Sequence, residues 1–430
     1  MATLVTPSKL RDLQRALYRR AKSEPRFRFY ALYDKVYRPD VLAHAFAVAK
    51  GNDGAPGPDG KTFEQIEEDG EAALLEQLHD ELKAKTYRPG PVRRVYIPKT
   101  GGGERPLGIP NIRDRVVQTA AKLVLEPIFE ADFDPDSYGF RPKRSAHDAL
   151  AVVRESLEQG MCWVLDADIA SYFDTIPHDR LMKAVAERVV DGSMLALVKM
   201  FLMAPIVDER DGGSPRRPGK GTPQGGVISP LLANIYLHLL DRNFRRHVER
   251  GELEGRLVRY ADDFVLLSSR NPVRERAWVE SVLERLGLTL HPDKTRIVHA
   301  GKDHFDFLGY RFRRRWKYVS LDIAKKSLAR IRDAIRARTC DTGASLAEVV
   351  EGLSVYIRGA RAYFGRARQR RLFSLDHFVD QRVARWWARK HQSPGPAWSL
   401  VRQDGLRRRH GLERWYVLRE NRSTRSRPDG

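Results

Sequence analysis

Cysteine and long hydrophobic runs are what this chain has least of. Only two cysteines, Cys162 and Cys340, occur in 430 residues, too few for a Cys-rich zinc module. Their wide separation suits a reducing compartment. The chain has no run of about 18 apolar residues, which a transmembrane helix would need. Its first 27 residues lack the hydrophobic core of a signal peptide. These absences predict a cytoplasmic protein with no membrane partner; no protein partner can be inferred.

The chain also has fewer acidic than basic residues. The chain has 56 Asp and Glu against 77 Lys and Arg, which gives a net charge of +21. The acids gather around residues 64–81, whereas the last third carries arginine runs at 311–315, 366–371 and 407–409. A basic surface of this kind attracts polyanions and releases counterions when it binds them. We therefore expect the protein to bind nucleic acid.

A Gly-Pro segment separates a helical start from a basic hairpin. Residues 1–50 have apolar positions at helical spacing, and the loop GNDGAPGPDGKTF follows at 51–63. Thr62 and Gln65 are spaced as a capping box for the next helix. Residues 93–98 and 105–109 then predict two strands around a glycine turn. Lys99 and Arg105 flank that turn, where they could close on phosphates.

The segment 136–150, DSYGFRPKRSAHDAL, mixes aromatic and basic side chains. Arg141, Lys143 and Arg144 precede a helix that Ser145 should cap. Basic residues interleaved with aromatics are typical of a contact with a nucleic-acid backbone. An ordinary surface loop remains the alternative interpretation.

Two acidic strands carry the chemistry. Leu257 to Ser268, LVRYADDFVLLS, predicts a hairpin whose turn holds Asp262 and Asp263. A solvated Asp-Asp turn would explain that pair equally well. However, Asp168 ends a second buried strand, where the nearby Asp166 could be structural. If the strands are neighbours, three carboxylates converge and need divalent cations to offset their repulsion. Hard oxygen ligands favour Mg²⁺, with Mn²⁺ as a substitute, and two such ions support nucleotidyl transfer.

The ordered motifs resemble those of the group II intron-encoded reverse transcriptase and maturase family. They are APGPDG, RPLGIP, SYGFRPKRSAHDAL, DADIASYFDTIPHD, GTPQGGVISPLLANIYL, YADD, HPDKT and FLGYRF. Together they cover residues 50–313. The helical remainder, with GLSVYIRGARAYFG and LDHFVDQRVARWWARK, is similar to the family's thumb and maturase region, so the resemblance spans almost the whole chain.

The resemblance implies an α+β right-hand polymerase. Residues 1–50 would form a helical N-terminal extension. Fingers and a palm with an RRM-like antiparallel sheet would occupy residues 51–313. An all-helical thumb and maturase domain would occupy 321–393. Residues 394–430 would form a short basic segment that could bind DNA through Trp398 and Trp415, with a disordered tail from about Ser423.

Site residues are implied by matching position. Asp168, Asp262 and Asp263 would be the catalytic metal ligands, with the Ile169 carbonyl as an extra ligand. The residues implied to contact nucleotide or nucleic acid are Lys99 and Arg105 on the incoming triphosphate, Phe173 as a gate against a ribose 2′-hydroxyl, Gln224 beside the nascent base pair, Lys294 near the primer end or triphosphate, and Tyr260.

The function implied is RNA-directed DNA polymerisation, with intron RNA binding that assists splicing and retrohoming. The partners would be an RNA template, a group II intron RNA, a DNA primer or target, and dNTPs. With two cysteines and little sequence beyond Trp415, we expect an endonuclease-lacking form. Two alternatives stay open: a non-catalytic splicing maturase, and an intron-free reverse transcriptase used in defence or repair.

Overall fold

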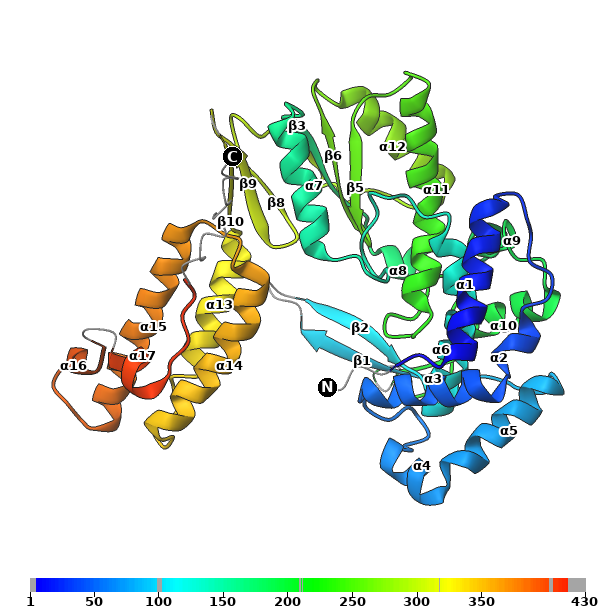
Figure 1. Ribbon diagram of the computed structural model, residues 1–430, viewed down its shortest axis with the longest axis horizontal. Coiled ribbons are helices and arrows are strands. Elements are labelled where there is room, and N and C mark those ends of the chain that lie inside the picture. Colours follow the sequence, from blue (N-terminus) through cyan, green and yellow to red (C-terminus); the bar gives the residue numbers. More distant parts are fainter. Residues whose placement is uncertain are drawn as a thin grey trace, which may run out of the picture. The chain divides into compact units, whose positions relative to one another are not determined.

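A computed structural model describes residues 5–98, 103–208, 210, 212–316, 318–401 and 405–416. Lys99 and the tail from Ser423 lie outside these residues. The chain divides into two compact units (Figure 1). Unit 1 contains residues 1–152 and 165–297, and unit 2 contains residues 153–164 and 298–430.

The described chain contains both helices and strands. The helices are α1 (Ser8–Ser23), α2 (Tyr33–Val36), α3 (Pro39–Gly51), α4 (Phe63–Asp69), α5 (Glu71–Lys83), α6 (Ile112–Glu130), α7 (Ala146–Glu158), α8 (Tyr172–Thr175), α9 (His178–Ala186), α10 (Gly192–Leu202), α11 (Ser229–Glu249), α12 (Val273–Arg285), α13 (Lys325–Ala337), α14 (Leu346–Phe364), α15 (Gln369–Lys390), α16 (Trp398–Val401) and α17 (Gly405–His410). The strands are β1 (Val92–Pro98), β2 (Glu104–Ile109), β3 (Trp163–Asp168), β4 (Ile206–Asp208), β5 (Arg256–Tyr260), β6 (Asp263–Ser268), β7 (Arg296–His299), β8 (Phe305–Phe307), β9 (Tyr310–Arg314) and β10 (Val319–Ile323). Among the helices described, none is both long and apolar enough to cross a membrane.

The palm sheet has the strand order β5-β6-β3-β7. Helix α11 precedes β5, and α12 joins β6 to β7, so the sheet and these helices follow a β-α-β-β-α-β path. This order confirms the predicted RRM-like palm and the α+β class. It also makes β3 and β6 the two central, adjacent strands, which brings the two acidic segments of the sequence together.

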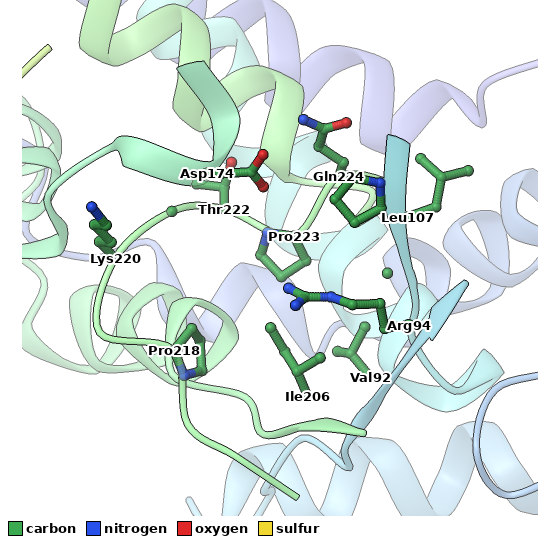
Figure 2. A pocket seen from close by; sticks show the side chains of 13 residues that line it. Val92, Arg94, Leu107, Asp174, Ile206, Pro218, Lys220, Thr222, Pro223 and Gln224 are labelled. Carbon is green, nitrogen blue, oxygen red and sulfur yellow. The ribbon is translucent and has the colours of Figure 1, made fainter. Parts of the chain in front are cut away.

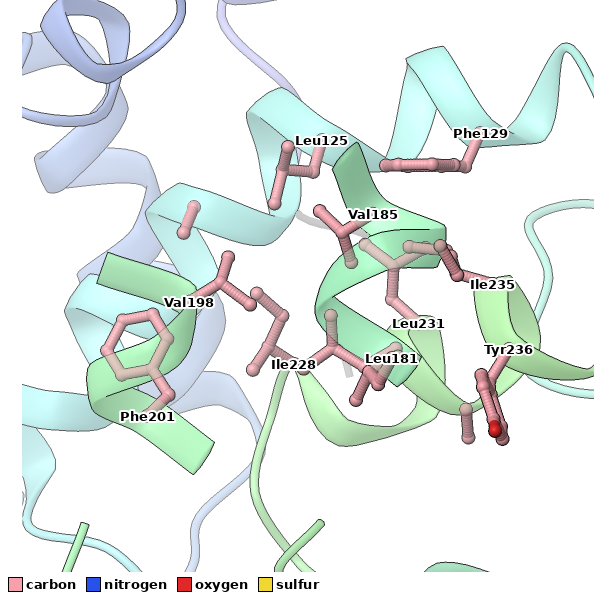
Figure 3. Packing of buried hydrophobic residues seen from close by; sticks show 14 of the residues in the cluster. Leu125, Phe129, Leu181, Val185, Val198, Phe201, Ile228, Leu231, Ile235 and Tyr236 are labelled. Atoms are coloured by element: carbon pink, nitrogen blue, oxygen red, sulfur yellow. The ribbon is translucent and has the colours of Figure 1, made fainter. Parts of the chain in front are cut away.

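The core beneath this sheet is built from helix faces. Apolar residues recur at three- and four-residue spacing on α6, α9, α10 and α11, and the side chains that result are fully or almost fully buried. Figure 3 shows them interdigitating: Leu125 and Phe129 from α6, Leu181 and Val185 from α9, Val198 and Phe201 from α10, and Leu231 and Ile235 from α11. Burial of each such side chain contributes about 1.5–3 kcal/mol. The same cluster contains Leu165 of β3 and Phe264 of β6, so these helices pack against the sheet.

The finger hairpin forms as predicted. Strands β1 and β2 are antiparallel, with Arg93 paired to Ile109 and Ile97 paired to Arg105. Strand β4 adds to β1 in parallel. Upstream, Thr62 and Gln65 form the predicted capping box at the start of α4, because each side chain bonds the other's backbone N–H.

The longer part of unit 2 starts at Val298 and includes the sheet β10-β9-β8. The predicted end of the palm at residue 313 and start of the thumb and maturase domain at residue 321 stay predictions. The predicted C-terminal segment, residues 394–430, is described at 394–401 and 405–416. Trp415 is 1% exposed, and Arg407 is buried in ion pairs with Asp376 and Asp380. Residues 405–416 are therefore part of the helical unit.

Candidate active site

The acidic hairpin of β5 and β6 has a two-residue turn. Tyr260 pairs with Asp263, which leaves Ala261 and Asp262 at the tip. Ala261 has a φ of +58°, in the left-handed region that L-residues other than Gly seldom adopt. Asp262 is half-buried, whereas Asp263 is exposed. The turn thus presents two neighbouring carboxylates in a constrained geometry.

Asp168 ends the adjacent strand β3, and its charge acts on the two acids of this turn. Burial and then the charge of Asp168 raise the pKa of Asp262. Burial, Asp262, Asp168 and Asp166 together raise the pKa of Asp263 to about 7. Although the Asp263 side chain is accessible to solvent, the protein atoms around it exclude enough water to disfavour its charged form. The three predicted catalytic acids therefore lie close enough to repel one another.

Two basic side chains partly offset that repulsion. Lys294 Nζ lies 2.5 Å from Asp168 Oδ2, and it also lowers the pKa of Asp263. Arg105, from the finger strand β2, lowers the pKa of Asp262. The structure thus brings Arg105 and Lys294 near the acids, and their predicted contacts with a triphosphate or primer end stay predictions. Lys99 lies outside the described residues.

The donor set fits a hard divalent cation. The acids carry only oxygen donors, and an ammonium group already occupies the position beside Asp168. Across the described residues, no three His, Cys, Asp or Glu side chains stand close enough together to hold a metal ion as they are. Lys294 is paired with Asp168 in this arrangement. The Ile169 side chain is buried, and the role of its carbonyl stays a prediction.

The loop 221–226 joins the finger hairpin to the palm. Gly108 N–H of β2 donates to the Gln224 carbonyl, and Thr222 N–H donates to the Phe173 carbonyl. A Cβ on Gly225 would lie 2.5 Å from the Gly108 carbonyl oxygen, so only glycine allows this approach. Gln224 and Phe173 are therefore held in one hydrogen-bonded assembly, and each retains partial exposure.

A pocket opens on one side of this loop. Figure 2 shows Arg94 of β1 pointing in near Pro223, with Lys220 and Asp174 on other sides of the cavity. These two basic residues were not among the predicted site residues. Their signal in the sequence was weak, because an isolated Arg or Lys on a strand or loop is common.

Phe173 packs edge-on against two aromatic rings. Its ring centroid lies 5.5 Å from that of Tyr172 and 6.5 Å from that of Phe140. Phe140 belongs to the predicted nucleic-acid segment and is 52% exposed. The segment 136–150 is therefore brought beside the predicted ribose gate.

Arg141 has a structural role that differs from the predicted contact with nucleic acid. Its guanidinium is buried, forms an ion pair with Glu130, and donates to the carbonyls of Asp134 and Ser137. Lys143 and Arg144 are exposed, and Tyr260 is half-buried at the end of β5. Of the four residues predicted to contact nucleic acid, Lys143, Arg144 and Tyr260 are thus accessible to solvent, and their contact stays a prediction.

Asn234, Asp241 and Arg259 are polar residues behind the turn that sequence patterns did not single out. All three are buried, and they form one hydrogen-bonded group. A signal existed in the arginine of LVRY, which interrupts an otherwise apolar strand. Without a known partner, however, it was indistinguishable from an exposed strand residue.

Comparisons with known proteins match two parts of the chain to family models. Residues 97–312 match the family described as reverse transcriptase (RNA-dependent DNA polymerase). Residues 328–404 match the group II intron, maturase-specific domain. A solved structure of telomerase from Candida albicans with a fragment of telomeric RNA gives a TM-score of 0.44 at 13% identity, covering 75% of this chain and 63% of that one.

Two curated relatives extend the comparison. Protein YkfC of Escherichia coli (strain K12) is 39% identical over 352 residues, which cover 73% of this chain and 91% of YkfC. The group II intron-encoded protein LtrA of Lactococcus lactis subsp. cremoris is 31% identical over 350 residues, which cover 66% of this chain and 57% of LtrA. The chain thus spans little more than half of LtrA. By its matched domains and its acidic palm, the chain belongs to the reverse transcriptase family, as an RNA-directed DNA polymerase with a group II intron maturase-specific domain.

Proposed function

We propose that this reverse transcriptase extends a primer 3′-hydroxyl along an RNA template by nucleotidyl transfer with two Mg²⁺ ions. The observation that supports the proposal is that Asp168 ends β3 beside β6, which begins at Asp263, and that the charges of Asp262 and Asp168 raise the pKa of Asp263. Carboxylates that raise one another's pKa bind divalent cations in place of protons.

Asp168, Asp262 and Asp263 would hold the ions, with the Ile169 carbonyl as a further ligand and Mn²⁺ as a substitute. When bound, the ions would make the primer hydroxyl a better nucleophile and stabilise the leaving pyrophosphate. The chain itself supplies positive charge near the acids, from Arg105 beside Asp262 and from Lys294 beside Asp168. Arg105 and Lys294 would bind the triphosphate, together with Lys99 across the finger turn.

Phe173 and Gln224 would shape the nucleotide site. The Phe173 ring, supported by Tyr172 and Phe140, would exclude a ribose 2′-hydroxyl. Gln224, whose backbone is tied to β2, would lie beside the nascent base pair. Lys143, Arg144 and Tyr260 would contact the nucleic acid.

We further propose that the protein binds a group II intron RNA to assist splicing and retrohoming into a DNA target. The maturase-specific match at 328–404 and the net charge of +21 support this role. A cytoplasmic location is part of the proposal, and it suits the two free cysteines.

The test is Mg²⁺-dependent extension of a DNA primer on an RNA template. Asp262→Ala should abolish extension, whereas Asp12→Asn, which changes an exposed acid on α1, should not. Binding of an intron RNA, compared with a shuffled RNA of equal length, tests the second role. A folded protein that binds the intron RNA but never extends a primer would favour the non-catalytic maturase. Extension without preference for intron RNA would favour the intron-free alternative.

A further inference from the structure

A buried guanidinium lies directly behind the acidic turn. Arg259, on β5, is 1% exposed. Its Nε donates to Asp241 Oδ1 at 2.9 Å, and its Nη2 donates to Asp241 Oδ2 at 2.6 Å. Asp241 is also buried, and it belongs to α11, which packs in the palm core. This two-point ion pair fixes the plane of the guanidinium relative to a rigid helix.

The remaining donor of that guanidinium reaches the turn itself. Arg259 Nη1 donates to the Ala261 carbonyl at 2.8 Å and to Asn234 Oδ1 at 3.0 Å. Ala261 is the first turn residue and has the φ of +58°. The left-handed conformation costs a non-glycine residue about 1–2 kcal/mol, so a local contact has to maintain it. The Arg259 bond is such a contact, one residue before Asp262.

A second element holds the turn from the other side. Arg259 N–H donates to the Asp136 carbonyl, and Tyr138 N–H donates to the Arg259 carbonyl, each at 2.9 Å. Asn234 Nδ2 donates to the Gly139 carbonyl at 2.8 Å. A Cβ on Gly139 would lie 2.3 Å from the Ala261 nitrogen. Segment 136–139 therefore lies in direct backbone contact with the turn, and Asn234 ties it to the same guanidinium.

We propose that Arg259 is a positioning residue for nucleotidyl transfer. Held by Asp241 and Asn234, it fixes the Ala261 peptide and thereby the directions in which Asp262 and Asp263 leave the turn. This inference rests on the proposed function. Misplacing a catalytic group by about 1 Å can cost about 100-fold in rate. The competing explanation is a buried ion pair that only stabilises the palm.

The test separates these explanations by removing the ion pair as a whole. Deleting one partner of a buried pair leaves an uncompensated charge, whereas replacing both by apolar residues of similar size is often tolerated. The variant is therefore Arg259→Met with Asp241→Leu. Its control is Arg188→Met with Asp132→Leu, which removes an ion pair of unit 1 between a buried Arg188 and a half-buried Asp132; none of its hydrogen bonds to the described residues reaches the turn. Arg259→Lys, which keeps a charge for Asp241 but loses the fork, is the second variant if the double one does not fold.

Two readouts are measured on the full chain. Single-turnover extension should be about 100-fold slower in the Arg259 variants, with primer–template affinity within about 3-fold of wild type. Hydrogen exchange of the peptide that contains residues 260–264 should become at least about 10-fold faster. The control should change neither quantity.

An unchanged single-turnover rate together with unchanged exchange of the turn would overturn the proposal. A loss of folded protein alone, with a normal rate in the fraction that folds, would also overturn it, because a purely stabilising pair predicts that result. If wild-type protein does not extend primers, the proposed function fails, and the exchange measurement still decides whether Arg259 orders the turn.

Discussion

Asp263 combines solvent access with a carboxyl pKa raised to about 7. The unfolded chain releases this proton near the ordinary pKa of 3.8, whereas the folded protein retains it to about 7. The folded state therefore binds more protons between these values. It follows that this residue lowers the free energy of unfolding as pH rises through that window, and that the loss persists above it.

Asp263→Asn should therefore stabilise the protein in EDTA at pH 8 by about 1 kcal/mol, a value reduced for solvent screening of a partly exposed group. At pH 4 the variant and wild type should differ little. Thermal melts at the two pH values check this. Mg²⁺ should raise the melting temperature of wild type but not of the variant. A variant that is less stable than wild type at pH 8 would show that repulsion between the Asp263 carboxylate and its neighbours does not destabilise the folded protein.

At the element scale, sequence patterns predicted each strand that carries an acid and the hairpin that carries Arg105. These elements have strong local signals: alternating apolar residues, a glycine turn and a capping box. The adjacency of β3 and β6 was conditional, because strand order depends on how α11 and α12 pack and no local pattern encodes it. The resemblance to a known family supplied what periodicity could not.

Roles that depend on long-range partners were harder to predict. The sequence predicts that Arg141 is an exposed basic residue in its loop. In the structure its guanidinium is buried, paired with Glu130 and bonded to two carbonyls. Arg259 reads as an ordinary strand residue, yet Asp241 on α11 binds it. In both cases the partner lies on another element, so only the fold reveals whether the charge faces solvent or protein.

The contact between the loop 221–226 and strand β2 gives a prediction at this scale. Gly225→Ala places a Cβ 2.5 Å from the Gly108 carbonyl at a φ of +108°. The loop must then move away from β2, and Gln224 moves with it. We expect KM for dNTPs to rise about 10-fold or more.

Gly219→Ala is the matched control, because a Cβ there meets nothing within 4 Å. It should leave KM within about 2-fold of wild type. Steady-state extension with varied dNTP measures both variants. Equal KM values for Gly225→Ala and wild type would mean that the contact with β2 does not position the nucleotide site.

At the scale of the whole molecule, the net charge of +21 predicts strongly salt-dependent RNA binding. If 6–10 phosphates are contacted, affinity should fall about 1000-fold or more between about 50 and 200 mM salt. Titrations at several salt concentrations give the slope of log affinity against log salt.

Alanine substitutions at exposed and at buried basic residues should have different effects on RNA binding. The double variant Lys143→Ala with Arg144→Ala should reduce the magnitude of the slope by about 2. Arg141→Ala should instead lower the melting temperature, because it leaves Glu130 without its partner. An unchanged slope in the double variant would exclude these two side chains from the RNA interface.

Unit 2 is assembled from two distant parts of the chain. Residues 153–164 join it from the middle of the sequence, and Ala300 N–H closes onto the Cys162 carbonyl at 2.7 Å. That bond spans on the order of 140 residues, a separation typical of high contact order and slow folding. During synthesis, segment 153–164 must therefore wait until the palm that follows it has emerged. A fragment that starts at residue 298 would lack this segment, so unit 2 cannot be excised as one continuous piece with its native contacts intact.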